Sequence, residues 1–368
     1  MRLLIWSGSY PPSIGGVEVV VQGLARSLAA RGMTVAVVTQ ASGTGTLVEH
    51  TPEGVVHRLP CHQVLSARDP GQVLDLTRQI TALVRAFRPD VVHAHAVHPS
   101  EFFLLRALDR APCPLVFTLH GWTTMTGGDQ AIRERMLRAA AVITGCSRHV
   151  TAAIVDALPA VADRVETIYN GCVDGGVTGG ARPVEPPRLL AAGRLVALKG
   201  FVDLIEAMPM VRASYPAAQL IITGDGPERA TLEARCRQLG LDDCTQFTGE
   251  LPRAGVLAQM NAATLVVVPS RTEGLGLVAL EAALMERPVV ARAVGGLTEA
   301  VVDGETGVLY DNSAALAAAI TGLLDAPERA TQMGRAGRAR VRRDFDWDQQ
   351  IDHYADAYAR AVHRQRSS

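Results

Sequence analysis

The sequence predicts an α/β protein built from two doubly wound parallel sheets, each covered by helices. Short apolar runs rich in Val, Ile and Leu alternate with longer segments of helical period along most of the 368 residues. This alternation is typical of βαβ units, whose strands are buried on both faces. A segment dense in Gly and Pro, residues 175–187, interrupts the alternation and divides it into two halves. The length favours about two to three domains over a single one.

The first half is expected to form a domain over residues 1–174. Its apolar runs predict strands at Arg2–Trp6, Met33–Thr39, Val55–Leu59, Asp90–Ala94, Leu115–Leu119, Ala141–Gly145 and Val165–Tyr169. The amphipathic segments between them predict helices over 17–31, 72–87, 99–110, 130–140 and 147–157. The segment 175–187 is then a linker, because it has almost no apolar periodicity.

The second half is expected to form another domain over residues 188–345. Its expected strands are Leu189–Ala192, Gln219–Thr223, Thr245–Thr248, Leu265–Val268, Val289–Ala291 and Gly307–Leu309. Its expected helices span 199–212, 227–239, 252–260, 276–286 and 313–325. The end is helical from Glu328 to Val362 with a break at 344–348, where Asp346 is placed to cap a terminal helix over 346–368.

Composition and charge exclude several classes of protein. The 36 Lys and Arg balance 37 Asp and Glu, so there is no basic excess of the kind that nucleic-acid binding needs. The six Cys form no CxxC pair, which argues against a zinc site and a disulfide framework. The apolar run in the opening MRLLIW is too short for a signal peptide or a membrane span, so we expect a cytoplasmic protein.

Two cations follow the first strand of the second half. Arg194 and Lys199 lie in AAGRLVALKG, and Lys199 is the one Lys of the sequence beside 35 Arg. A planar guanidinium and a point charge on either side of a strand-to-helix turn can converge on a diphosphate, next to the partial positive charge of a helix N-terminus. The alternative is that Lys199 is only a solvated residue at a helix start.

Two carboxylates flank a glycine-containing turn in PSRTEGLGLVALEAALMERP, residues 269–288. Gly274 and Gly276 let backbone N–H groups approach a phosphate, and Glu273 could bind hydroxyls of a sugar. Glu281 is the one charged residue from Gly274 to Met285, so it lies on an apolar helix and is expected to be buried. A buried carboxylate needs partners. Ribose hydroxyls would serve, and a salt bridge to an Arg is the alternative.

The first half carries weaker signals. Gly15–Gly16 lie between a strand and a helix, as in a phosphate-binding turn, although turns use Gly routinely. His120 stands at the carboxyl end of a buried strand, where side chains project toward a ligand. His93, His95 and His98 follow the preceding strand in VVHAHAVH. We expect no metal there, because no carboxylate pattern accompanies these imidazoles.

Taken together, these segments resemble the family 4 retaining glycosyltransferases of GT-B fold over nearly the whole chain. The resemblance rests on the Gly15–Gly16 loop, VVHAH, TLHG, IYNGCVD, GRLVALKG, TGDGP, the Glu273 and Glu281 pair with its E-x7-E spacing, and VGGLTE. It implies two Rossmann-like domains that face each other across a cleft, with a C-terminal helix that crosses back to the first domain. One departure is Thr298, where the family pattern has proline.

The resemblance implies transfer of a sugar from a nucleotide-sugar donor to a hydroxyl, with retention and without a metal or other cofactor. His120, Glu273, Arg194 and Lys199 would be catalytic. The implied donor-binding residues are Gly15, Gly16, Arg194, Lys199, Leu251, Glu273, Gly274, Leu275, Gly276, Leu277 and Glu281. Arg194 and Lys199 would hold the departing diphosphate, Glu273 the donor sugar and Glu281 the ribose.

The substrates are less defined. We expect a UDP- or GDP-sugar whose base is contacted near 249–251, and a small-molecule, glycan or lipid-linked acceptor. The expected acceptor contacts are Tyr10, Arg68, His98 and Trp122. Arg78, Arg85 and Arg88 near one helix leave a peripheral membrane contact open, while the balanced charge favours a soluble acceptor. A monomer or a homodimer fits the sequence.

Three other functions are weighed against transfer. A nucleotide-sugar epimerase or hydrolase would use the same fold and phosphate site without an acceptor. A non-catalytic nucleotide-sugar-binding subunit would keep the donor site alone. A dinucleotide oxidoreductase is disfavoured, because no GxGxxG follows the first strand and Thr39–Gln40 stand where an acidic residue is expected.

Overall fold

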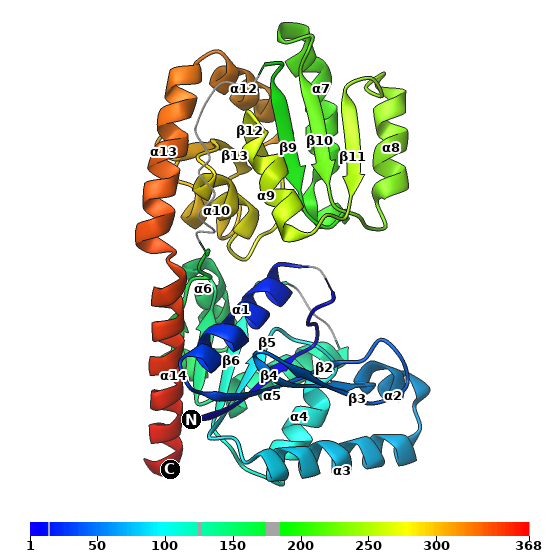
Figure 1. Ribbon diagram of the computed structural model, residues 1–368, viewed down its shortest axis with the longest axis vertical. Coiled ribbons are helices and arrows are strands. Elements are labelled where there is room, and N and C mark those ends of the chain that lie inside the picture. The colour runs from blue at the N-terminus through cyan, green and yellow to red at the C-terminus, as the bar shows by residue number, and fades with distance from the viewer. Residues whose placement is uncertain (14, 124–126, 174–184, 368) are drawn as a thin grey trace. The chain divides into compact units, whose positions relative to one another are not determined.

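A computed structural model describes residues 1–13, 15–123, 127–173 and 185–367 (Figure 1). Contacts divide the chain into two units. Unit 1 comprises Met1–Tyr169 and Asp348–Ser368, and unit 2 comprises Asn170–Trp347. Most of the expected linker, residues 175–187, lies outside the described residues. Each unit contains one sheet flanked by helices, so the predicted α/β class is confirmed.

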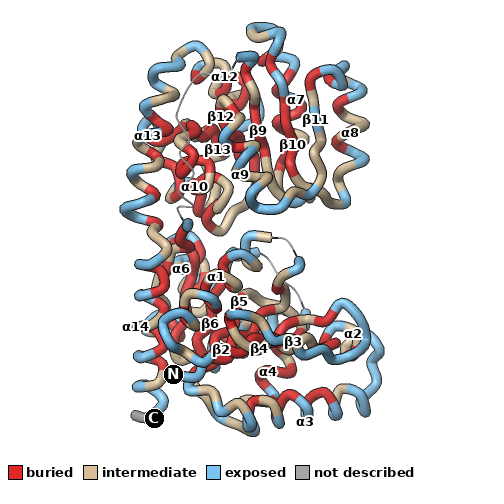
Figure 2. Tube along the Cα trace, viewed as in Figure 1, coloured by how far each residue is buried: buried red, intermediate tan, exposed pale blue. Residues whose placement is uncertain are grey.

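Within the described residues, unit 1 contains an eight-stranded sheet in the order β3-β4-β2-β1-β5-β6-β7-β8. Its strands are β1 (Arg2–Ser7), β2 (Thr34–Gln40), β3 (Leu47–Thr51), β4 (Gly54–Leu59), β5 (Val91–His95), β6 (Leu115–Leu119), β7 (Val142–Gly145) and β8 (Val165–Thr167). All neighbours are parallel except β3 and β4. Every residue of β5 and β6 is buried, as expected for central strands covered on both faces (Figure 2).

The helices of unit 1 lie between these strands. They are α1 (Gly16–Ala30), α2 (Cys61–Ala67), α3 (Pro70–Phe87), α4 (Glu101–Leu108), α5 (Gly127–Ala139), α6 (Arg148–Ala157) and the 3-10 helix η1 (Pro159–Arg164). Polar caps set two of their starts. Asp69 accepts from the N–H groups of Gly71 and Gln72 before α3, and Ser147 accepts from Val150 before α6.

The described part of unit 2 contains a six-stranded sheet, parallel throughout, in the order β11-β10-β9-β12-β13-β14. Its strands are β9 (Arg188–Ala192), β10 (Gln219–Thr223), β11 (Thr245–Gly249), β12 (Leu265–Val268), β13 (Val289–Arg292) and β14 (Gly307–Tyr310). Its helices are η2 (Ala197–Lys199), α7 (Phe201–Ser214), α8 (Arg229–Gln238), α9 (Arg253–Asn261), α10 (Leu277–Leu284), α11 (Leu297–Ala300), α12 (Ser313–Leu324) and α13 (Pro327–Asp344).

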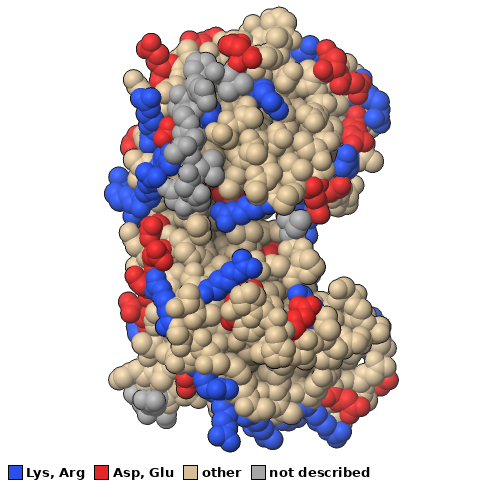
Figure 3. Space-filling view, in the orientation of Figure 1, with Lys and Arg blue, Asp and Glu red and all other residues tan. Residues whose placement is uncertain are grey.

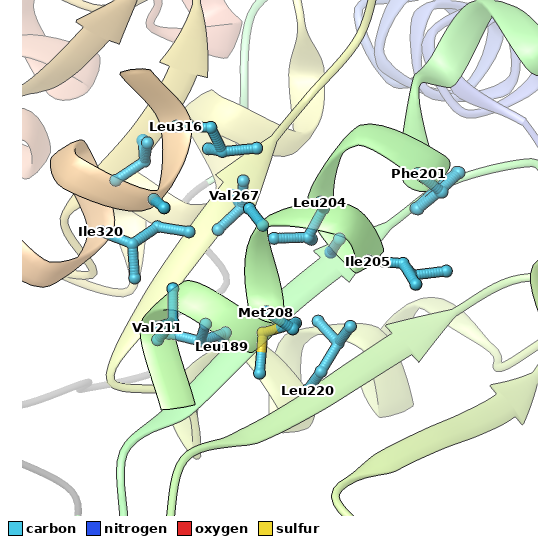
Figure 4. Packing of buried hydrophobic residues seen from close by; sticks show 14 of the residues in the cluster. Leu189, Phe201, Leu204, Ile205, Met208, Val211, Leu220, Val267, Leu316 and Ile320 are labelled. Carbon is cyan, nitrogen blue, oxygen red and sulfur yellow. The ribbon is translucent and has the colours of Figure 1, made fainter. Parts of the chain in front are cut away.

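The core of unit 2 lies between its sheet and α7 and α12 (Figure 4). Leu204 and Met208 of α7 are completely buried, as is Ile320 of α12. They pack with Leu189 and Val267 of the sheet. This packing holds β9 and β12 side by side and so positions the loops that follow them.

The last helix, α14 (Trp347–Ser367), is shared between the units in sequence, and from Asp348 on it belongs to unit 1. Tyr354 and Tyr358 are completely buried there. Arg360 forms an ion pair of 2.6 Å with Glu166, the residue in the middle of β8. The predicted return of the C-terminal helix to the first domain is therefore confirmed, while the cap by Asp346 stays a prediction.

Some elements differ from the expectation. The sequence did not predict β3, α2 or α11, and α7 begins at Phe201 rather than at residue 199. The later start has a local cause. Gly200 adopts a left-handed conformation with φ 65°, and Lys199 ends the preceding 3-10 turn. No helix in the described residues combines the length and the apolar character that a membrane crossing requires.

Candidate functional site

The sheet of unit 2 places two loops beside each other. From β9 the chain proceeds to β10 and β11 on one side, and β12, β13 and β14 lie on the other side. The loops after β9 and β12 therefore flank the topological switch point, where ligands bind in open α/β sheets. These loops carry Arg194 and Lys199, and the segment 269–276. The N–H of Arg271 donates to the carbonyl of Leu198 at 2.8 Å, which joins the two loops directly.

Lys199 and Glu273 form an ion pair across this switch point. The Lys199 ammonium donates to Oε1 of Glu273, and the Ser270 hydroxyl donates to the same oxygen at 3.0 Å. The side chains keep 30% and 15% of their exposure respectively, so a ligand can reach the pair. The structure thus brings together two of the four expected catalytic residues, and Lys199 is not simply a solvated residue.

Arg194 lies on the same loop, between Gly193 and Leu195. Its carbonyl accepts from the N–H of Val196, but its exposed side chain forms no hydrogen bond or ion pair with any described residue. A guanidinium on the loop of Lys199, without a side-chain partner in the described ranges, has its donors available for an anion. The exposed Arg194 side chain is compatible with the expected diphosphate contact, which stays a prediction.

Glycines hold the loop after β12 in place. Gly276 has φ 95° and immediately precedes α10, so a side chain there would be strained. The N–H of Gly296 donates to the carbonyl of Glu273 at 3.0 Å. A Cβ on Gly296 would lie 2.0 Å from the carbonyl oxygen of Gly274. The VGGLTE segment therefore packs directly against this loop, and Thr298 is accommodated in the short helix α11.

The remaining residues of the loop have different surroundings. Leu275 is 2% exposed and belongs to the core, whereas Gly274 and Leu277 are partly exposed. Leu251 lies in the connection between β11 and α9 and is also partly exposed. The buried Leu275 side chain is therefore not available to a ligand.

Glu281 lies on α10 and is largely buried, as expected from its apolar helix. Its carboxylate forms an ion pair of 3.4 Å with Arg253 at the start of α9. Burial raises the pKa of Glu281, and the nearby Arg253 opposes that rise. The salt bridge left open by the sequence is thus present in the free protein. Since the Arg253 side chain is 39% exposed, it can move aside for a ligand.

Unit 1 has its own switch point between β1 and β5. Gly15 lies before α1, and Gly16 is the first residue of that helix. The carboxylate of Glu18 occupies the space beside Gly15, at 2.3 Å from where a Cβ would lie. Because an acidic group already lies at this helix N-terminus, the phosphate contact expected at Gly15 and Gly16 would have to displace it.

His120 follows β6, the strand next to β5. Its Nε2 lies 3.0 Å from Nδ1 of His95, the last residue of β5. Burial lowers the pKa of His120 to about 4 and also lowers that of His95. Both rings are therefore neutral near pH 7.

The expected acceptor residues have varied surroundings. Tyr10 is 3% exposed, and its hydroxyl donates to the buried Glu53 at 2.9 Å. Trp122 has the Arg133 guanidinium 4.1 Å from its ring centroid. The backbone N–H of His98 donates to Glu101 at 2.6 Å. Arg68 is exposed. The acceptor contacts stay predictions, and those at Tyr10 and Trp122 require rearrangement of these partners.

The basic residues near α3 line a groove rather than a site at a strand end. Arg78, Arg85 and Arg110 line a cavity of about 620 Å³ together with less polar residues such as Leu74. Figure 3 shows Lys and Arg side chains gathered at this edge of unit 1. Among the residues that the structure describes, no three His, Cys, Asp or Glu side chains gather as metal ligands would.

Comparison with known proteins decides the family. Residues 14–173 match the family described as Glycosyltransferase Family 4, and residues 179–340 match Glycosyl transferases group 1. A glycogen synthase from Mycobacterium tuberculosis is 32% identical over all of this chain and 96% of its own length. The chain belongs to glycosyltransferase family 4.

Other relatives of this family 4 glycosyltransferase carry different names. A D-inositol 3-phosphate glycosyltransferase from Thermomonospora curvata is 31% identical over 94% of this chain and 91% of its own length. A solved sucrose-phosphate synthase from Thermosynechococcus elongatus has a TM-score of 0.84 and 23% identity, covering 99% of this chain and 100% of that one. Anabaena HepE, solved with UDP and glucose, has a TM-score of 0.80 and 23% identity, covering 98% and 99%. These structures confirm the GT-B fold.

Three partners of the candidate residues were not predicted: in unit 1, His95 as a partner of His120, and in unit 2, Arg253 as the partner of Glu281 and Ser270 as a second donor to Glu273. His95 carried a usable signal, because it ends a strand next to the strand that precedes His120. Arg253 carried none, since the sequence holds 35 Arg and only the packing of α9 against α10 selects one of them.

Proposed function

We propose that this glycosyltransferase moves a sugar from a nucleoside-diphosphate donor to a hydroxyl acceptor, with retention of the anomeric configuration and without a metal. The observation that carries the proposal is the Lys199 and Glu273 ion pair at the switch point of unit 2, with the exposed Arg194 on the same loop.

The chemistry supports this arrangement. The barrier to transfer is separation of a sugar with cationic character from a diphosphate that gains negative charge. Fixed positive charge next to that leaving group stabilises the transition state more than the ground state. Lys199 and Arg194 supply two such charges on one short loop, with backbone N–H groups near Gly276 beside them. A strong base is not required, since a leaving-group oxygen can accept the proton of the acceptor hydroxyl.

The roles of the other residues follow from the same proposal. Glu273 binds hydroxyls of the donor sugar. Glu281 gives up its ion pair with Arg253 and binds the ribose hydroxyls instead. Leu251 and its neighbours contact the base, for which UDP and GDP are our first expectation. His120 of unit 1 contacts the transferred sugar. The acceptor contacts are proposed at Arg68 and His98, and at Tyr10 and Trp122 after rearrangement.

The experiment is a transfer assay in EDTA with UDP-, GDP- and ADP-glucose. The names of the relatives suggest glycogen and D-inositol 3-phosphate as the first acceptors. We expect one donor to yield a glycoside whose anomeric configuration, measured by proton NMR, equals that of the donor. An inverted product, or activity that requires a divalent metal, would contradict the corresponding part of the proposal.

The same assay separates the alternatives. Conversion of the donor to its C2 epimer without an acceptor would identify an epimerase, and release of free sugar alone a hydrolase. A non-catalytic subunit would bind the donor without consuming it, and its partner complex would keep full activity with Lys199→Ala and Glu273→Ala.

A further inference from the structure

His95 and His120 are joined ring to ring at the carboxyl ends of two adjacent strands. The two bonded nitrogens, His95 Nδ1 and His120 Nε2, are 3.0 Å apart, and the ring planes differ by only 15°. With the nitrogens 3.0 Å and the ring centroids 5.3 Å apart, the rings meet at their nitrogen-bearing edges, as an N–H···N bond allows. The other two nitrogens, His95 Nε2 and His120 Nδ1, are buried and have no hydrogen-bond partner among the described residues.

The two ring nitrogens in this buried pair call for a partner beyond the residues that the structure describes. A buried polar atom without a hydrogen bond costs about 1–3 kcal/mol, so such atoms are normally satisfied by water or by a ligand. His95 is completely buried. The ends of the two strands thus carry unsatisfied hydrogen-bonding atoms at His120, the residue of unit 1 that the proposed function places against the transferred sugar.

The protons of this pair are coupled. A neutral imidazole has one N–H donor and one bare nitrogen. If His95 Nδ1–H donates to His120, then His120 carries its own proton on Nδ1, and His95 Nε2 is bare. If His120 Nε2–H donates to His95, then His95 carries its proton on Nε2, and His120 Nδ1 is bare. In both cases the two rings hold the same tautomer, and the outer nitrogens offer one donor and one acceptor.

A third imidazole, that of His93, packs against the His95 ring and has a different role. His93 uses both of its nitrogens, Nδ1 with the Tyr358 hydroxyl at 2.8 Å and Nε2 with the Thr118 hydroxyl at 2.7 Å. Its ring centroid is 3.9 Å from that of His95. Because His93 is fully bonded and completely buried, it holds the His95 ring in place and is not itself available to a ligand.

We infer that His95 is a positioning residue for His120, and that His120 Nδ1 binds a hydroxyl of the transferred sugar as donor or acceptor, according to the tautomer that the two rings share. A sugar hydroxyl can both donate and accept, so it can bond to His120 Nδ1 in either state, and the tautomer of His95 changes with it. No net proton transfer is needed. The inference rests on the proposed function for the identity of the ligand, whereas the matched tautomers concern the free protein alone.

The first test is ¹⁵N NMR of the protein labelled at histidine, at pH 7, with His95→Asn and His120→Asn used to assign the ring signals. We expect both rings to be neutral and both to carry the proton on the same type of nitrogen, Nδ1 in both or Nε2 in both. One ring protonated on Nδ1 with the other on Nε2, or a doubly protonated ring, would overturn the coupled pair. This readout does not depend on any activity.

The second test compares two substitutions of one residue. The amide of His95→Asn lies near the position of Nδ1 and can keep the bond to His120, whereas the amide of His95→Gln lies near Nε2 and loses it. We expect His95→Asn to keep kcat within about threefold of wild type and His95→Gln to lower it about tenfold or more, with similar melting temperatures. Equal losses of kcat, or none in either variant, would overturn the positioning role.

The two proposals fail in distinguishable ways. If the wild-type protein binds no nucleotide and transfers no sugar, the proposed function fails, while the NMR measurement still decides whether the tautomers match. If transfer occurs and the tautomers are mixed, only the inference about His95 fails.

Discussion

Lys199 is the residue on which the donor site depends most. Its ammonium is bonded to Glu273, so in the free protein the charge is held in place by a carboxylate rather than by water. A charge positioned in advance needs little reorganisation when negative charge develops on the leaving group. The sequence singled out this residue because every other basic residue is Arg.

Removing this charge should therefore affect transfer more than folding. We expect Lys199→Ala to lower kcat/KM by about 10²- to 10³-fold, the range for loss of one fixed donor to a developing charge. Arg329→Ala is the matched control, because it removes an exposed cation from α13. Steady-state kinetics give kcat/KM for both variants and for wild type. Equal kcat/KM for Lys199→Ala and the control would contradict the assigned role.

Glu281 should show opposite effects on stability and binding. Burial raises its pKa above that in the unfolded chain, so its contribution to stability falls as the pH rises through the folded-state pKa. The neutral Glu281→Gln should therefore raise the melting temperature of the free protein at pH 7. It should also weaken nucleoside-diphosphate binding about 10- to 100-fold, as for a lost hydrogen bond to a charged group.

Calorimetry in the presence and absence of nucleotide measures both effects on the same variant. A lower melting temperature together with unchanged affinity would show that Glu281 serves only its salt bridge to Arg253.

At the scale of elements, the loop after β12 depends on its contact with the VGGLTE segment. A Cβ on Gly296 would lie 2.0 Å from the Gly274 oxygen and 2.6 Å from Leu275 Cα, and both neighbours are backbone. We expect Gly296→Ala to lower the free energy of unfolding by about 1–3 kcal/mol, as for overpacking, and to weaken donor binding.

Gly322→Ala is the control for this substitution. Gly322 lies in α12, and nothing lies within 4 Å of a Cβ built there. Alanine in a helix should stabilise the protein by about 0.5–1 kcal/mol. Denaturant unfolding of the two variants should give shifts of opposite sign. A Gly296→Ala variant as stable as wild type would mean that the loop after β12 and the VGGLTE segment do not constrain each other.

The sequence predicted the strands and helices that show a clear pattern of apolar residues, and it missed those that are too exposed or too short to show one. The strands β5, β6 and β12 are fully buried, and most of their residues are Val, Leu, Ala or Phe, so these short apolar runs identified them. In contrast, β3 is an edge strand in which Leu47 and Val48 are 51% and 49% exposed, and it therefore has no buried face to reveal it. The helices α2 and α11 span only seven and four residues, about two turns and one turn, too few for an apolar pattern to repeat over several turns.

The candidate site was predictable where a residue type carried its own chemistry. Lys199, Glu273 and Glu281 stand out by charge in apolar or glycine-containing surroundings. Partners supplied by packing were not predictable. His95 and His120 meet because β5 and β6 are neighbours, and Glu281 meets Arg253 because α9 packs against α10.

For the whole molecule, the buried imidazoles of unit 1 should make the free energy of unfolding depend on pH. Burial lowers the pKa values of His93, His95 and His120 below the ordinary value of 6.5. The unfolded chain then binds more protons than the folded one below pH 6.5, so the free energy of unfolding should fall as the pH drops from about 6.5 toward 4. Urea unfolding across this range measures the slope.

A substitution separates the contribution of the buried histidines to this pH dependence from the contributions of other titratable groups. His120→Asn should reduce the slope of stability against pH, whereas His353→Asn, at an exposed position of α14, should leave it as in wild type. An unchanged slope in His120→Asn would contradict a neutral, buried His120.

The central claim, a nucleoside-diphosphate sugar site on unit 2, is tested most directly by thermal unfolding with UDP, GDP, ADP, dTDP and their sugars in EDTA. We predict that one nucleotide family raises the melting temperature, with about 2.7 kcal/mol of added stability at one hundred times its dissociation constant. Lys199→Ala should abolish the rise, and Arg329→Ala should keep it. No rise with any of these ligands, or an equal rise in Lys199→Ala, would contradict the claim.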